Sequence, residues 1–149
     1  MLRLRKDDRA AVTYKADAHM EGGIVSRTEI ELNVDNFEVA QKLFEALGYR
    51  KMVVYEKYRR VYKLGDVLVM LDELPFGDFV EIEAPNNILI DGMAQMLGLN
   101  VDLGIRTNYL GLFEMLKLKQ TLKFEDLTFE NFQNLAITPA DLGVEPADA

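Results

Sequence analysis

Apolar and polar residues alternate at the start of the chain with the period of two that indicates a half-buried β-strand. In residues 2–6, Leu2 and Leu4 point to one face, while Arg3 and Arg5 point to the other. Similar runs, bounded by turn residues, predict the remaining strands at residues 10–15, 27–34, 52–63, 67–73 and 79–83. The first two strands, separated by the polar residues 7–9, form a predicted hairpin.

Apolar residues at helical spacing predict three helices among these strands. The first follows Asp35, an expected N-cap with Glu38 as its capping-box partner, and it stops at Gly48. The second covers residues 87–97 and ends at Gly98, and the third covers residues 107–119 with Thr107 as its cap. A shorter helix is expected within residues 124–135.

The segments between these elements carry turn residues. We expect a mobile loop at residues 16–26, where Gly22-Gly23 breaks the pattern, and a hairpin turn at residues 63–66. Pro75 and Gly77 interrupt the chain before the last strand, and residues 138–149 are expected to be frayed. Strands and helices in this order predict the α+β class.

Composition narrows the range of functions. The chain has 149 residues, which fits one domain, and its net charge of −8 disfavours nucleic acid and anionic membranes as partners. It has no cysteine, so disulfides and thiolate chemistry are excluded. No apolar run approaches the roughly 20 residues of a membrane span, and the first residues lack a hydrophobic signal core. We therefore expect a cytoplasmic location.

The polar faces of the predicted strands carry both signs of charge in regular alternation. These residues are Arg3, Arg5, Lys15, Arg27, Glu29, Glu31, Lys57, Arg59, Glu81 and Glu83. Arg and Lys bind phosphate oxygens, and carboxylates bind Mg²⁺ or Mn²⁺. A sheet curled with these charges inward can hold a polyanion together with its metal. The periodicity also allows an open sheet whose charged stripes face solvent.

Six motifs occur in an order that resembles the CYTH superfamily, the triphosphate tunnel metalloenzymes. The resemblance covers about residues 2–116 and is nearest to class IV adenylyl cyclases. The turn Gly48-Tyr49 after the first predicted helix also fits the family. The six motifs are LRLRK at 2–6, VTYK at 12–15, RTEIEL at 27–32, EKYRRVY at 56–62, VMLDELPFGDFVEIE at 69–83 and GLNVDLGIRTNYLGLF at 98–113.

The resemblance implies an antiparallel β-barrel, closed or incomplete, that forms a tunnel with helices packed outside. It implies Mg²⁺ or Mn²⁺ as the cofactor, and Lys15 and Arg59 as catalytic residues. The implied substrate-binding residues are Arg3, Arg5, Lys15, Arg27, Lys57, Arg59 and Arg106. The implied metal ligands are Asp72, Glu81, Glu83, Glu29 and Glu31.

Several of these residues also have a simpler interpretation. Arg3 and Arg5 suit an exposed edge strand, where charge prevents aggregation. Asp72 suits the approach to the turn at Pro75. His19 in a glycine-containing loop is assigned no role, and the tyrosines of the long strand suit packing.

The chain departs from the family in two respects. The family's N-terminal Glu-x-Glu-x-Lys strand is not found, and the similar stretch Glu29-Ile30-Glu31 has Asn33 at the position that requires Lys. The tail beyond residue 118 also exceeds the usual end of the family. A wrongly chosen start codon, a fragment or a genuine short variant each explain the missing strand. A short variant leaves an unpaired strand edge, which favours a homodimer. The predicted division is a CYTH-like domain at residues 1–118 and a partly ordered C-terminal extension at residues 119–149.

Three functions follow from the resemblance. The first is a cyclase that converts ATP to cyclic AMP and pyrophosphate, the second a hydrolase of tripolyphosphate, thiamine triphosphate or a nucleoside triphosphate. The third is a non-catalytic protein that binds nucleotides or inorganic polyphosphate. Residues 56–62 and 77–83 favour the cyclase.

Overall fold

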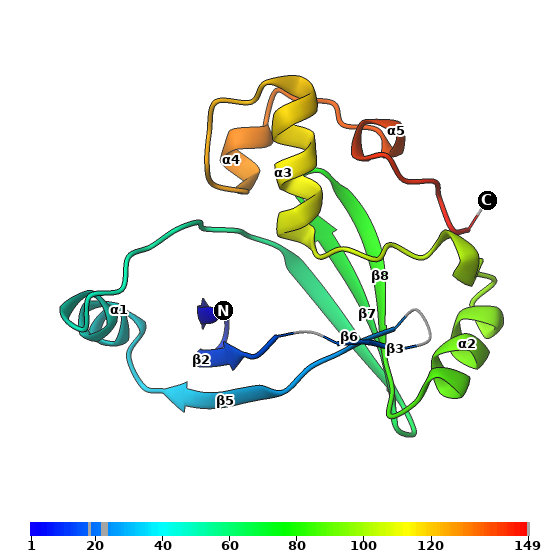
Figure 1. Ribbon diagram of the computed structural model, residues 1–149, viewed down its shortest axis with the longest axis horizontal. Helices are drawn as coiled ribbons and strands as arrows, with labels where there is room; N and C mark the ends of the chain where they lie inside the picture. The colour runs from blue at the N-terminus through cyan, green and yellow to red at the C-terminus, as the bar shows by residue number, and fades with distance from the viewer. Residues whose placement is uncertain (18, 22–23, 149) are drawn as a thin grey trace. The chain divides into compact units, whose positions relative to one another are not determined.

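Most strands expected from the alternating pattern form, and they pair into antiparallel sheets. The structure is a computed structural model, and it describes residues 1–17, 19–21 and 24–148. The chain divides into two units, Met1–Met52 and Val53–Ala149. Each unit is built around one three-stranded sheet, and the described residues include one helix in the first unit and several in the second (Figure 1).

The sheet of the first unit has the strand order β1-β2-β5. Its strands are β1 (Leu2–Lys6), β2 (Ala10–Lys15) and β5 (Glu29–Val34). The register sets Thr13 opposite both Arg3 and Glu31, and Lys15 opposite Glu29. Side chains directly opposite each other share a face, so the expected charged face is confirmed within this sheet.

Residues 16–26 were expected to be a loop, and this expectation is wrong for most of the segment. Strands β3 (His19–Glu21) and β4 (Ile24–Ser26) pair there as an antiparallel ribbon. Ile24 and Val25 are β-branched, which favours extended backbone over a loop. The breaker expected at Gly22-Gly23 lies outside the described residues.

Helix α1 (Phe37–Ala46) begins one residue later than predicted. Asn36, not Asp35, is the N-cap, because its backbone is extended and its side chain accepts a hydrogen bond from Val39 N at 2.9 Å. The expected capping box is replaced by an ion pair between Glu38 and Lys6 Nζ at 2.8 Å. The predicted stop is confirmed: Gly48 has a φ of +90°, a conformation that glycine adopts without strain.

The sheet of the second unit has the strand order β6-β7-β8. Its strands are β6 (Tyr58–Leu64), β7 (Val67–Leu74) and β8 (Gly77–Glu83). The strand predicted at 52–63 is therefore too long at its start. Tyr55 instead forms an isolated parallel bridge with Leu127, and Val54 N donates to Asp126 Oδ1 at 2.7 Å.

Three helices of the second unit, α2, α3 and α4, lie where they were predicted, with small shifts at their ends, whereas η1 and α5 were not predicted. The third predicted helix is capped by Asn108 rather than Thr107, because the Asn108 side chain accepts from Gly111 N. The helices are α2 (Asn87–Met96), the 3₁₀ turn η1 (Val101–Leu103), α3 (Tyr109–Gln120), α4 (Phe129–Phe132) and α5 (Pro139–Leu142).

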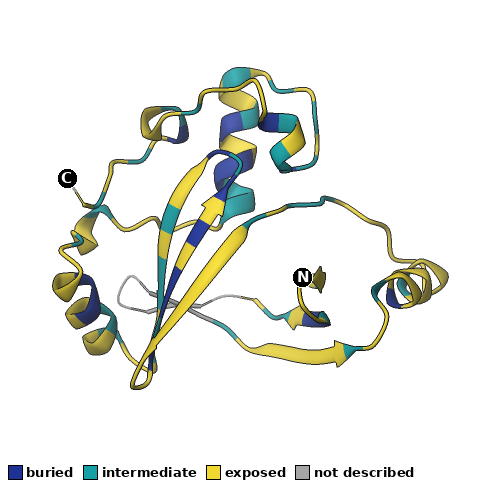
Figure 2. Cartoon of the chain, turned by 180° about the vertical axis from the view of Figure 1, so that it is seen from behind, coloured by how far each residue is buried: buried dark blue, intermediate teal, exposed yellow. Residues whose placement is uncertain are grey.

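The main core of the second unit lies between the sheet end and helices α3, α4 and α5, where buried residues gather in Figure 2. It consists of Leu74, Phe76, Leu112, Phe113, Leu116, Leu127, Phe132 and Leu142. Leu142 shows that the expectation of a frayed end is wrong for α5. Thr138 and Asp141 form a reciprocal capping box, and Pro139 sets the first turn.

The α+β class is confirmed, but the sheets do not close into a barrel within the described residues. The strands form two three-stranded sheets and one two-stranded ribbon, and no strand pair joins one sheet to another in that part of the chain. No helix in the described ranges has the length and apolar character needed to cross a membrane.

Candidate functional site

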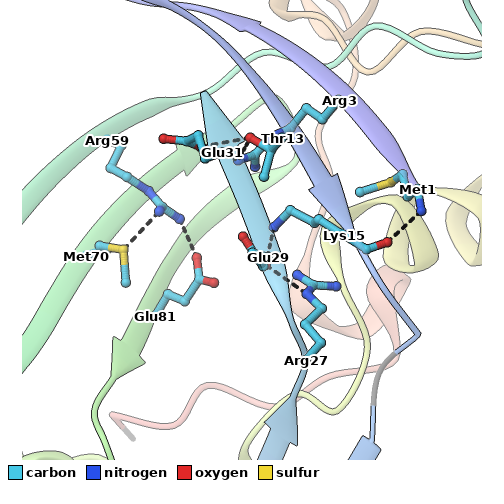
Figure 3. A network of polar contacts seen from close by, with 10 residues as sticks. All are labelled: Met1, Arg3, Thr13, Lys15, Arg27, Glu29, Glu31, Arg59, Met70 and Glu81. Atoms are coloured by element: carbon cyan, nitrogen blue, oxygen red, sulfur yellow. Dashed lines mark hydrogen bonds and ion pairs between the residues drawn. The ribbon is translucent and has the colours of Figure 1, made fainter. Parts of the chain in front are cut away.

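One face of the first sheet carries two groups of polar contacts, most of which are drawn in Figure 3. Arg3 Nη2 donates to Thr13 Oγ1 at 3.1 Å, and this hydroxyl donates to Glu31 Oε2 at 2.8 Å. Glu31 also lies 3.6 Å from Arg3 Nη2 and 3.5 Å from Arg5 Nη2. Thr13 is completely buried, so the hydroxyl acts as a fixed bridge between the two charges.

A second group on the same sheet surrounds Glu29. Lys15 Nζ and Arg27 Nε donate to the same oxygen, Glu29 Oε1, at 2.7 and 2.8 Å. Burial raises the pKa of Glu29, but the hydrogen bonds from Lys15 and Arg27 outweigh this effect and lower the pKa below its ordinary value. The Lys15 side chain is only 11% exposed, so an acceptor that reaches it meets a largely desolvated ammonium.

These two groups bring six predicted site residues together, and we call them the charged face of the first sheet. They are Arg3, Arg5, Lys15, Arg27, Glu29 and Glu31. The cations outnumber the carboxylates, even when Asp7, which pairs with Arg5 at 3.2 Å, is included. Arg3 Nε is buried without a hydrogen-bond partner among the described residues. This face therefore has donors to spare for an anion.

In the second unit, Asp72 collects donors from three other residues. Its Oδ1 accepts from Arg59 Nε at 2.5 Å. Its Oδ2 accepts from Arg59 Nη2 at 2.5 Å, from Lys57 Nζ at 2.9 Å and from the Tyr109 hydroxyl at 2.8 Å. The Asp72 side chain has no exposed surface, so this carboxylate is charged and buried at the same time.

Arg59 links all three strands of the second sheet. It lies on β6 and pairs with Asp72 on β7. It also donates to Glu81 on β8 and to Met70 Sδ, the latter at 2.8 Å (Figure 3). The antiparallel register sets Arg59 opposite Asp72 and Met70 opposite Glu81, which aligns these side chains on one face. We call Lys57, Arg59, Asp72, Glu81 and Tyr109 the Asp72 cluster.

The contacts within the Asp72 cluster shift the pKa values of Asp72, Arg59 and Tyr109. Burial raises the pKa of Asp72, but the hydrogen bonds from its donors outweigh this and lower the pKa to about 2. Burial lowers the pKa of Arg59, yet the carboxylates of Asp72 and Glu81 raise it above its ordinary value. Burial also raises the pKa of the Tyr109 hydroxyl, as do the charge of Glu81 and the bond to Asp72. Tyr109 is thus a neutral donor.

Two predicted site residues join neither group. Glu83 is exposed at the end of β8, and Arg106 is exposed shortly before α3. Neither forms an ion pair with any residue whose side chain the structure describes. Sequence reasoning also missed two participants, Thr13 and Tyr109. Both stand within the motifs VTYK and GLNVDLGIRTNYLGLF, but neither is charged, so the pattern of charges gave no reason to select them.

Four of the five carboxylates predicted to bind a divalent metal ion lie against cations of the protein. In the described part of the chain, no three acidic or His side chains gather in a way that would hold one. Glu29, Glu31, Asp72 and Glu81 each bind Arg or Lys instead. The four donors on Asp72 use the acceptor capacity of a carboxylate, which has about four lone-pair positions. In this arrangement the carboxylates do not fit a metal centre.

Comparison with known proteins points to one family. Residues 1–87 match the family model described as the CYTH domain. A curated protein of Methanocaldococcus jannaschii, named "Putative adenylate cyclase", is 30% identical over 122 residues, which are 74% of this chain and 69% of that protein.

Two solved structures are similar to this chain in fold and in sequence. The first, from Pyrococcus horikoshii OT3, has a TM-score of 0.64 and 30% identity over 72% of this chain and 71% of its own. The second, a conserved hypothetical protein from Pyrococcus furiosus, has a TM-score of 0.63 and 28% identity over 74% of this chain and 72% of its own.

Proposed function

The chain belongs to the CYTH domain family, and on this basis we propose that it binds the triphosphate group of a nucleoside triphosphate or of inorganic polyphosphate. The family binds triphosphate substrates and is typically metal-dependent. The resemblance read from the six sequence motifs is therefore confirmed at the level of the family. The substrate and the reaction of this chain are our proposal.

The observation that supports triphosphate binding is the surplus of donors on the charged face of the first sheet. Lys15 is largely desolvated, and Arg3 Nε is a buried donor without a partner among the described residues. A buried unpaired donor costs about 1–3 kcal/mol, so an acceptor that reached this guanidinium would recover that cost. Phosphate oxygens suit it, because they accept from guanidinium groups in a bidentate fashion.

The reaction that we propose is the conversion of ATP to cyclic AMP and pyrophosphate. The ribose 3′-hydroxyl loses its proton to water as its oxygen attacks the α-phosphorus, and the bond from that phosphorus to the oxygen shared with the β-phosphate breaks, so that pyrophosphate leaves. Lys15 and Arg59 stabilise the charge that develops on the phosphate oxygens. Support comes from the similarity to the named cyclase and from the motifs at residues 56–62 and 77–83. The other cations proposed to hold the triphosphate are Arg3, Arg5, Arg27, Lys57 and Arg106.

Mg²⁺ or Mn²⁺ is the cofactor expected from the family. The predicted ligands are Asp72, Glu81, Glu83, Glu29 and Glu31, and these assignments stay predictions. Because four of the five carboxylates bind Arg or Lys here, we assign no step of the reaction to a metal. The pairing of these predicted metal ligands with Arg and Lys is a specific reason to keep a second candidate function, that of a non-catalytic protein that binds polyphosphate or nucleotides.

We further propose that the chain forms a homodimer, and that strands close into a tunnel when a triphosphate is bound. Strand β6 supports the dimer, because it is an edge strand of its sheet and every one of its residues is exposed. An edge strand offers unpaired backbone N–H and C=O groups to another strand. A tunnel needs such edges to be paired.

Phosphorus NMR tests the proposed function directly. The protein is incubated with Mg²⁺ or Mn²⁺ and, in separate samples, with ATP and tripolyphosphate, while calorimetry measures binding of each. We expect the Arg3→Ala, Lys15→Ala double variant to bind at least about a hundredfold more weakly, since each hydrogen bond to a charged group contributes about 1.5–3 kcal/mol. The matched control is Lys42→Ala, Arg50→Ala, which removes the same two kinds of charge at exposed positions of the same unit.

The products separate the candidate functions. Cyclic AMP with pyrophosphate identifies the cyclase, and orthophosphate identifies a hydrolase of the triphosphate. Binding without turnover identifies the binding protein. If the wild type binds neither ligand, or if the control variant loses as much affinity as the double variant, the proposal is wrong.

A further inference from the structure

Tyr109 joins the Asp72 cluster from outside the segment that matches the family model. That segment is residues 1–87, whereas Tyr109 is the first residue of α3. Its hydroxyl donates to Asp72 Oδ2 at 2.8 Å, and its ring centroid lies 5.3 Å from Lys57 Nζ. A single aromatic side chain therefore contacts both the buried anion and one of the two cations beside it.

The surroundings of Tyr109 hold it in one position. Asn108 caps α3 by accepting from Gly111 N at 2.9 Å, which fixes the backbone at the start of the helix. On the sheet side, the Tyr109 ring packs against Phe79 of β8 at a centroid distance of 5.2 Å. Phe79 in turn packs edge to face on Phe76, a residue of the main core. The hydroxyl is thus aimed at Asp72 by rigid elements.

Lys57 is the group that this arrangement orients. Its ammonium donates to Asp72 Oδ2 at 2.9 Å and lies over the Tyr109 ring, so two fixed partners restrict a side chain that is otherwise flexible. An ammonium has more N–H donors than Asp72 uses, and the Lys57 side chain is still 19% exposed. The remaining donors can meet a ligand from solvent.

We propose that Tyr109 is a positioning residue that holds Lys57, through Asp72 and through its own ring, in the orientation that binds a phosphate group. This inference rests on the proposed triphosphate binding and adds α3 to the parts of the chain that serve it. Asp72 then acts as a buried anchor for Lys57 and Arg59 rather than as a metal ligand, since its lone pairs are already used by four donors.

The test is a double-mutant cycle that combines Tyr109→Phe with Lys57→Ala, with binding of tripolyphosphate measured by calorimetry. Tyr109→Phe keeps the ring and removes only the hydroxyl. We expect it to weaken binding about five- to tenfold, less than the loss of a direct hydrogen bond to the ligand would, because the lost bond acts on binding only by orienting Lys57. In the Lys57→Ala background the same change should have no further effect, because the group that it orients is missing.

A purely structural role for Tyr109 predicts a different pattern. Tyr109→Phe would then lower stability and weaken binding equally whether or not Lys57 is present. Tyr62→Phe is the matched control, because Tyr62 is exposed on β6 and alternation along the strand directs it to the face opposite Arg59. We expect this control to bind like the wild type.

The outcomes keep this inference separate from the proposed function. If the wild type binds tripolyphosphate and Tyr109→Phe binds equally well, or if the two effects are additive, the positioning role is wrong and the proposed function stands. If the wild type does not bind tripolyphosphate or ATP, both are wrong. If Tyr109→Phe weakens binding only when Lys57 is present, the result supports both the positioning role and the proposed function.

Discussion

At the scale of single residues, Asp72 shows how a buried charge can be retained in the second unit. An unpaired carboxylate without exposed surface would be strongly destabilising. Here two cations and one hydroxyl surround it, so that its pKa falls to about 2 although burial acts in the opposite direction. The folded structure therefore favours the charged form more than an unfolded chain does, and its stability becomes dependent on pH.

The direction of that dependence follows from the shift. The folded pKa of about 2 lies below the ordinary value of 3.8, so the stabilisation is complete above about pH 4 and is lost as the pH falls towards 2. A difference of this size corresponds to about 2 kcal/mol. We expect Asp72→Asn to lower the free energy of unfolding at pH 7, and we expect the gap between variant and wild type to narrow between pH 4 and pH 2.

Urea unfolding of both proteins at a series of pH values measures this gap. Asp78→Asn is the control, because Asp78 lies on β8 but is exposed. A gap that stays constant from pH 7 to pH 2 would show that Asp72 contributes through packing and not through its charge. The same residue illustrates what the sequence could not tell: charge alternation selected Lys57 and Arg59, but only the fold brought Tyr109 to Asp72 from 37 positions away.

At the scale of secondary structure, alternation and helical spacing predicted the existence of most elements but not their ends. Both misplaced N-caps, Asp35 and Thr107, stand one residue before an Asn that caps the helix. Asp, Thr and Asn are all good caps, so the choice depends on backbone angles that the sequence does not display. The strand prediction for residues 52–57 is wrong for a different reason. These residues pair with the chain near Leu127, which is remote in sequence, and such pairing produces no periodic pattern.

Strand β6 allows a test of the proposed homodimer at this scale. Tyr62 and Leu64 lie on its exposed surface and line an apolar groove of about 410 Å³ together with residues of β7, β8 and α2. If a second copy covers this edge, two charges placed there should be costly to bury. We expect Tyr62→Lys, Leu64→Lys to be monomeric in sedimentation velocity at concentrations where the wild type is dimeric.

Leu118→Lys provides the comparison, because Leu118 is 84% exposed and belongs to α3 rather than to β6. This variant should sediment like the wild type. A wild type that remains monomeric up to high concentration would refute the dimer, and so would a Leu118→Lys variant that dissociates as readily as the β6 variant.

At the scale of the whole molecule, charge and apolar burial are distributed unequally between the two units. Nine Lys and Arg side chains balance nine Asp and Glu in Met1–Met52, so the entire net charge of −8 belongs to Val53–Ala149. The first unit is therefore the part of the chain that repels a polyanion least, and it also carries the face with surplus donors. Long-range electrostatics and local contacts point to the same sheet.

Buried apolar residues are concentrated in the second unit, and hydrogen exchange can detect the resulting difference in local stability. Of the sixteen buried apolar residues described, only Ala11, Val12 and Ala40 belong to the first unit. Local opening is easiest where few apolar contacts are lost, so amides of β2 should exchange faster than those of β7. A ligand that binds the first unit only when folded stabilises it by about 2.7 kcal/mol at a hundred times its Kd. We therefore expect tripolyphosphate to slow exchange in β1, β2 and β5, and unchanged exchange in these strands would contradict binding at the charged face.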